Sequence, residues 1–73
     1  MNENNENEKN NMEAHINPAT DDYGRYLTGE PARSIEVWRG AKRLFKIVDI
    51  ESVTAGREIS RMLEGCGVKV IPT

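Results

Sequence analysis

The chain has 73 residues, a formal net charge of −2 and a single cysteine, which suits one small domain without an internal disulfide framework. No stretch is apolar enough for a signal peptide or a membrane span, so we expect a cytoplasmic protein that makes no membrane contact. The net charge hides a division: residues 1–24 hold six acidic residues and one lysine, whereas residues 25–73 hold nine basic and six acidic residues.

The N-terminal stretch MNENNENEKNNM is almost entirely polar. Between its first and last methionines there are only Asn, Glu and Lys, which offer no apolar surface to offset the entropy of ordering the chain. We therefore predict a disordered arm over residues 1–19 and a folded domain over residues 20–73. Where the domain begins, Thr20 is expected to cap a helical turn whose apolar side chains lie on the sheet. These side chains are Tyr23, Tyr26 and Leu27.

Residues 34–50 are expected to form a β-hairpin around the sequence RGAK. A turn with an odd number of residues matches the side chains best on both faces, and such matching sets strand register. The expected pairs are Ile35 with Ile47, Glu36 with Lys46, Val37 with Phe45, and Trp38 with Leu44. In this register the Ile35 and Phe45 side of the hairpin faces the core, and Trp38 points away from it.

Ser52 is expected to cap an amphipathic helix over about residues 53–64, and a last strand follows over about residues 68–71. The resulting order, ββαβ, predicts a small α+β domain. Its sheet would be three-stranded and antiparallel, with one helix packed on one face. A right-handed crossover would place the last strand beside the first strand of the hairpin and parallel to the second. The sheet face that carries Trp38 would then stay open.

Few residues could support catalysis. His15 is the only histidine and falls in the expected arm, while Cys66 is the only cysteine and is expected to be a small core residue. One histidine and one cysteine cannot furnish a structural zinc site. A body this small is also not expected to enclose a substrate cavity of about 300 Å³ or more. We therefore expect no catalytic residue, no metal, no cofactor and no enzyme activity.

The hairpin is the candidate binding surface. It combines the only tryptophan of the chain with four cations, and tryptophan and arginine are enriched in interface hot spots. The candidate partner-binding residues are Trp38, Arg39, Lys42, Arg43, Leu44 and Lys46. The cations could also serve only to protect an edge strand from aggregation.

Two classes of partner fit such a surface. A protein would use the tryptophan and leucine as apolar anchors, and a nucleic acid would use the cations and the aromatic ring. The acidic arm would compete with nucleic acid for the cations, which favours a protein partner.

The layout of the whole chain is a polar arm, a minimal ββαβ body, an exposed charged face and no catalytic equipment. It resembles the small phage-encoded proteins that bind host bacterial RNA polymerase, of the transcription inhibitor and antiterminator type. The resemblance rests on this layout and on no short motif. It implies binding to the polymerase core at its β′ subunit, inhibition of initiation and promotion of antitermination. We expect a monomer with a secondary nucleic-acid contact. The alternatives are a small nucleic-acid-binding module and a decoy that blocks a host defence protein.

Overall fold

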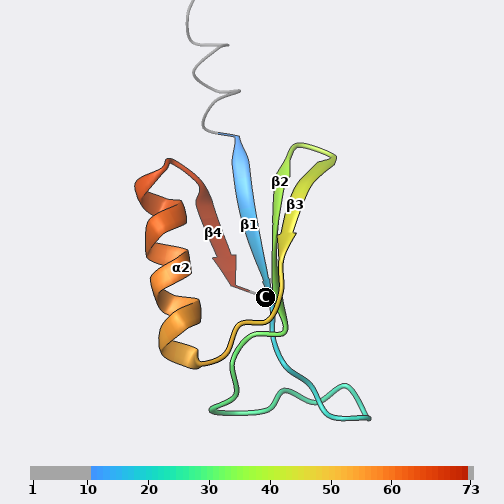
Figure 1. Ribbon diagram of the computed structural model, residues 1–73. Helices are drawn as coiled ribbons and strands as arrows, with labels where there is room; N and C mark the ends of the chain where they lie inside the picture. Colours follow the sequence, from blue (N-terminus) through green and yellow to red (C-terminus); the bar gives the residue numbers. More distant parts are fainter. Residues whose placement is uncertain (1–10, 73) are drawn as a thin grey trace, which may run out of the picture.

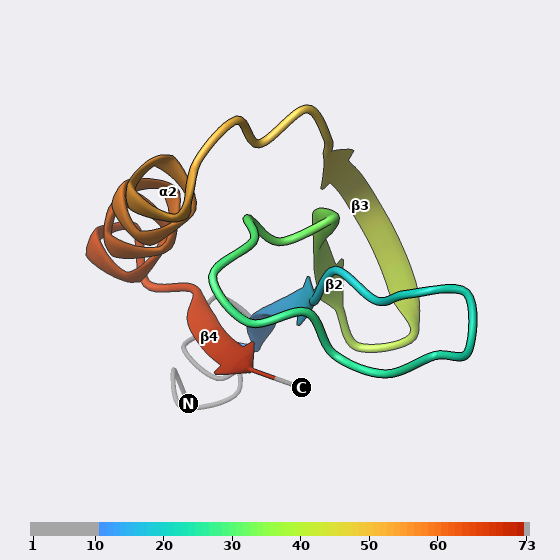
Figure 2. The same ribbon diagram turned by 90° about the horizontal axis from the view of Figure 1, so that it is seen from below.

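A computed structural model describes residues 11–72, which form four strands and one helix. The elements are β1 (Met12–Asn17), β2 (Ser34–Arg39), β3 (Lys42–Ile47), α2 (Val53–Gly65) and β4 (Lys69–Pro72). The strands form one mixed sheet in the order β3-β2-β1-β4, and α2 lies on one side of it (Figures 1 and 2). The small α+β class is confirmed, but the sheet has four strands where three were predicted.

The additional strand is β1, which occupies an interior position. It pairs antiparallel with β2 and parallel with β4. The prediction that the last strand lies directly beside residues 34–39 in a three-stranded antiparallel sheet is therefore wrong. The prediction of a disordered arm over residues 1–19 is wrong for residues 12–17, which form β1. The part of that prediction that concerns residues 1–10 lies outside the described residues.

β1 forms because its side chains alternate between the two faces of the sheet. Met12, Ala14 and Ile16 are apolar and point to one face, and the residues between them are polar. Ala14 is completely buried, whereas the polar neighbours are only half-buried. The apolar face of β1 therefore contributes to the core although it directly follows a polar stretch.

The β2–β3 hairpin has the predicted register in the half that is farther from the turn, and it departs from this register next to the turn. Ile35 pairs with Ile47, Glu36 with Lys46 and Val37 with Phe45, as predicted. The predicted pair of Trp38 with Leu44 is wrong, because a β-bulge shifts the register and Trp38 pairs with Arg43. Arg43 and Leu44 thus together oppose Trp38.

The bulge allows the hairpin to close with a two-residue turn. Only Gly40 and Ala41 lie between the strands, and Gly40 has a φ of 60°. A two-residue hairpin turn with glycine at its first position gives the backbone a twist that matches the twist of the strands. The even turn and the extra residue in β3 together reproduce the odd loop length that the side-chain pattern required.

The core lies between α2 and one face of the sheet, which we call the inner face. Its buried apolar residues are Ala14, Ile35, Val37, Ile50 and Val68. From α2, Ala55, Ile59 and Leu63 pack against them while remaining partly exposed. The helix begins where predicted, because the Ser52 side chain accepts a hydrogen bond from the Ala55 N–H at 3.0 Å.

Phe45 and Cys66 are more exposed than predicted. Phe45 is on the inner face but 48% exposed, and Cys66 is exposed at the C-terminal cap of α2. The position of β1 inside the sheet explains the exposure of Phe45. The helix α2 packs closest to β4, and because β1 and β2 lie between β4 and β3, β3 is at the opposite edge of the sheet. The helix therefore covers the β4 and β1 side of the inner face and leaves the β3 side open.

Candidate functional site

The face of the sheet opposite α2, which we call the outer face, is built mainly from polar side chains. The strand registers place Glu13 beside Trp38, His15 beside Glu36, and Asn17 beside Ser34. On the other side of β2, Lys46 lies beside Glu36 and Arg43 lies beside Trp38. Charged and aromatic groups from three adjacent strands thus meet on one surface.

Glu36 connects these strands through its carboxylate. Its Oε1 accepts a hydrogen bond from the indole Nε1 of Trp38 at 3.1 Å. Its Oε2 accepts one from Nδ2 of Asn17 at 3.2 Å and lies 4.0 Å from a guanidinium nitrogen of Arg43. The same Asn17 amide also donates to Oγ of Ser34 at 2.9 Å. Glu36 therefore holds the tryptophan in place and ties β1 to both strands of the hairpin.

Of the six predicted binding residues, four share the outer face or its edge. Trp38, Arg43 and Lys46 belong to the same set of facing positions, and the bulge residue Leu44 stands beside Arg43 with 38% of its surface exposed. We call Trp38, Arg43, Leu44 and Lys46 the hairpin patch. Trp38 is half-buried, and Arg43 and Lys46 are exposed.

The other two predicted residues lie apart from the hairpin patch. Arg39 and Lys42 pair with each other next to the turn, one position beyond Trp38 and Arg43, so alternation turns them toward the opposite face. A guanidinium nitrogen of Arg39 donates to Sδ of Met12 at 3.8 Å. These two cations extend the positive charge around the hairpin tip but do not join the Glu36 contacts.

Sequence reasoning missed the polar residues that organise this site. Asn17 and His15 were placed in the arm, although they are on β1, where Nε2 of His15 lies 3.1 Å from Oε1 of Glu13. Glu36 was identified only as the strand partner of Lys46. The alternation of apolar and polar residues in MEAHIN is the signal that could have located β1.

An open groove of about 510 Å³ borders the hairpin patch. Glu36, Lys46 and Val48 line it from the sheet side, and Thr20, Tyr26 and Arg33 line it from the loop between β1 and β2. Its volume is larger than the 300 Å³ or so that a body of this size was not expected to enclose. The space is not an enclosed cavity, however, but a surface groove formed where the loop crosses the edge of the sheet. Figure 2 shows that the first part of this loop lies beyond β3, away from α2, whereas the part just before β2 returns toward α2.

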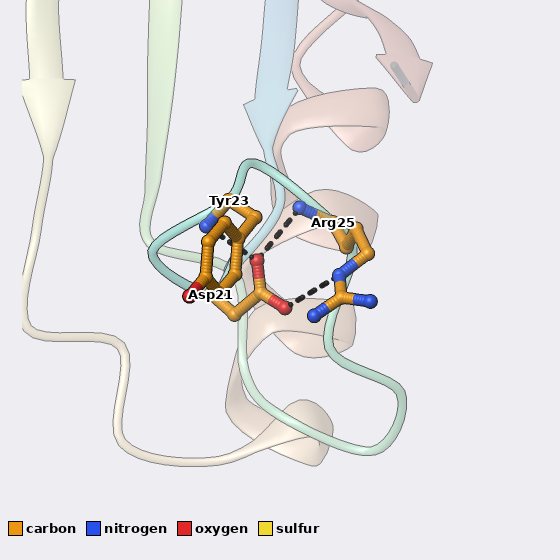
Figure 3. Close-up of polar contacts among 3 residues, drawn as sticks. All are labelled: Asp21, Tyr23 and Arg25. Atoms are coloured by element: carbon orange, nitrogen blue, oxygen red, sulfur yellow. Dashed lines mark hydrogen bonds and ion pairs between the residues drawn. The ribbon is translucent and has the colours of Figure 1, made fainter.

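The loop is held by Asp21 and does not form the predicted helical turn. Oδ1 of Asp21 accepts hydrogen bonds from the N–H groups of Tyr23 and Arg25 at 2.8 and 2.9 Å, and Oδ2 accepts from Nε of Arg25 at 3.0 Å (Figure 3). An isolated bridge joins Thr20 to Tyr26. The backbone donors thus go to a carboxylate instead of to helical carbonyls.

The same contacts affect the pKa of Asp21 and the exposure of the loop aromatics. The pKa of Asp21 lies below its ordinary value, chiefly because the Arg25 N–H donates to the carboxylate, with smaller support from the Tyr23 N–H and the Arg25 guanidinium. Tyr23 and Tyr26 were predicted to lie on the sheet, but they are 83% and 70% exposed. The guanidinium carbon of Arg25 lies 5.3 Å from the centroid of the Tyr23 ring.

Among residues 11–72, no three His, Cys, Asp or Glu side chains gather as a metal site would require. No helix in this part of the chain has the length and apolar character needed to cross a membrane. Comparisons with protein-family models, curated proteins and solved structures found no match. The arrangement of the outer face is therefore the basis for a functional proposal.

Proposed function

We propose that this protein is a non-catalytic binding protein that attaches to a partner protein through the hairpin patch. The supporting observation is the hydrogen bond from Trp38 to Glu36, because it fixes the aromatic ring beside Arg43 and Leu44 before any partner arrives. An aromatic anchor with an arginine next to it is the composition of interface hot spots, and ordering an anchor in advance reduces the entropy lost on binding.

The partner we propose is the core of bacterial RNA polymerase, with contact at its β′ subunit. This choice rests on the resemblance in layout to phage-encoded polymerase-binding proteins, and it predicts inhibition of initiation together with antitermination. Arg43 and Lys46 would meet acidic side chains at the rim, where charges mainly speed encounter and orient the complex. Trp38 and Leu44 would provide the apolar contact.

The test is direct binding of the purified full-length protein to purified bacterial RNA polymerase core, followed by transcription from a promoter and past a terminator. Saturable binding with reduced initiation supports the proposal. In parallel, the protein is titrated with single- and double-stranded DNA and RNA at two salt concentrations.

The nucleic-acid titrations distinguish the two classes of partner. Nucleic-acid affinity should fall steeply with salt when cations meet phosphates, whereas polymerase binding should depend on salt less strongly. Absence of polymerase binding would contradict the polymerase assignment. Nucleic-acid binding tighter than about micromolar at physiological salt would contradict the assignment to a protein partner, because nonspecific complexes are typically weaker.

A further inference from the structure

A second groove lies on the inner face, away from the hairpin patch. Like the groove beside the hairpin patch, it is open to solvent, and its volume is about 470 Å³. Ile16, Ile35 and Val70 line it from three adjacent strands, and Val53 and Gly56 line it from α2. The groove therefore has an apolar floor that continues the core of the protein.

The groove exists because α2 packs only partly onto the sheet. None of the described helix residues is fully buried, and α2 lies to the β4 side of the sheet (Figure 1). Ile35 is only 1% exposed, whereas Ile16 and Val70 are half-buried and still present apolar surface in the groove. A ligand chain lying on this floor would cover apolar surface without requiring the core to open.

Two arginines at the side of the groove give it a chemical preference. Arg57 and Arg61 both line the groove and are four residues apart on α2, which places them one turn apart on the same side of the helix. The ion pairs among residues 11–72 involve neither of them. Their guanidinium groups are thus available to a carboxylate or phosphate oxygen, for which arginine is well suited.

Two carboxylates also line the groove and limit the charge of its ligand. Glu64 is on the last turn of α2, and Glu30 is on the loop before β2. Seven residues separate Arg57 from Glu64, which corresponds to about 10 Å along a helix. A single negative charge at the Arg57 end would avoid Glu64, whereas a ligand with negative charge at both ends would be repelled.

We propose that this groove binds a monoanionic amphipath, a small molecule with an apolar chain and one carboxylate. The chain would lie on the half-buried Ile16 and Val70, next to Ile35, and the carboxylate would lie between Arg57 and Arg61. The site is on the opposite face of the sheet from Trp38, so this inference is independent of the proposed function.

The test uses octanoate as the probe and the full-length protein. Methyl NMR should show saturable shifts at Ile16, Ile35 and Val70, with the Trp38 indole signal unchanged, and octanoate should raise the melting midpoint because it binds the folded state. Arg57→Gln and Arg61→Gln should each weaken binding by about tenfold, as expected for loss of a charged hydrogen bond. Glu64→Gln should bind octanoate at least as tightly as the unchanged protein.

Octanol has an apolar chain like that of octanoate but no charge, and it should bind at least about tenfold more weakly if the arginines hold the carboxylate. Equal binding of octanol and octanoate would contradict a role for the arginines. Unchanged octanoate affinity in both arginine variants would also contradict this role, provided that their melting midpoints match that of the unchanged protein. Shifts spread over both faces of the sheet, or shifts that do not saturate, would show that octanoate has no defined site.

Discussion

The indole Nε1 of Trp38 donates a hydrogen bond to Oε1 of Glu36, two positions earlier on the same strand and the same face. Because the other carboxylate oxygen accepts from Asn17, this contact links the hairpin patch to β1. The position of Trp38 therefore depends, through Glu36, on β1, whose residues were predicted to lie in a disordered arm.

Glu36→Ala should lower the free energy of unfolding by about 1–3 kcal/mol, because it removes the acceptor from the Trp38 and Asn17 donors. The Trp38 fluorescence should also change as the ring loses its partner. Glu58→Ala is the control, since Glu58 is exposed on α2, and it should change stability by no more than about 0.5 kcal/mol. Chemical denaturation followed by tryptophan fluorescence measures both effects. Identical curves for the two variants would show that Glu36 does not organise the outer face.

Ala14→Asp should unfold the protein. The residue is 0% exposed in an interior strand, so the new carboxylate would be buried without a partner at a cost of several kcal/mol. A domain of this size is stabilised by only about 3–5 kcal/mol in total. The control is Glu13→Ala on the same strand and the outer face, which should remain folded. Far-UV circular dichroism and thermal melting distinguish the two, and a native melt for Ala14→Asp would place β1 outside the core.

Ile35→Ala should destabilise the fold by about 2–5 kcal/mol, whereas Phe45→Ala should cost only about 1 kcal/mol. Both residues are on the inner face of the hairpin, but Ile35 is 1% exposed and Phe45 is 48% exposed. This expectation reverses the one drawn from the sequence, in which Phe45 was a core residue. Thermal melts of the two variants under identical conditions provide the comparison. A larger loss for Phe45→Ala would mean that α2 covers β3.

The stabilising effect of Asp21 should depend on pH. Because its pKa is lowered in the folded protein, its contribution is fully present above the unfolded value of about 3.9 and is lost as the pH falls through the folded value. The melting midpoint of the protein should therefore exceed that of Asp21→Asn at about pH 6 and approach it at about pH 2.

Arg25→Ala should keep most of this pH dependence, since the leading donor to Asp21 is the backbone N–H of Arg25. If the melting difference between the protein and Asp21→Asn were the same at every pH, the carboxylate would not be holding the loop through its charge.

Local side-chain patterns predicted part of this fold well. The lower half of the hairpin register followed from matched pairs such as Ile35 with Ile47, and the helix start followed from the capping preference of Ser52. β1 was missed because its apolar residues, including the small Ala14, follow a strongly polar stretch that dominated the composition. The exposure of Phe45 could not be predicted without β1, because it depends on which strands α2 covers.

The candidate site was predictable only in part. Alternation along β2 correctly predicted that Trp38 points away from the inner face. The predicted strand partner of Trp38 was Leu44, but the bulge makes Arg43 its partner instead. The bulge depends on how a two-residue turn at Gly40 fits the strands, which side-chain matching alone does not determine. The link from Glu36 to Asn17 connects residues nineteen positions apart and required the position of β1.

The most direct test of binding through the hairpin patch is the affinity of Trp38→Ala and Phe45→Ala for RNA polymerase core. Both are aromatic truncations in one hairpin, but they lie on opposite faces of the sheet, so each controls for the other. Trp38→Ala should weaken binding by about 2 kcal/mol or more, roughly thirtyfold, while remaining folded. Phe45→Ala should bind like the unchanged protein. Equal affinities for the two variants, or a loss confined to Phe45→Ala, would contradict binding through the outer face.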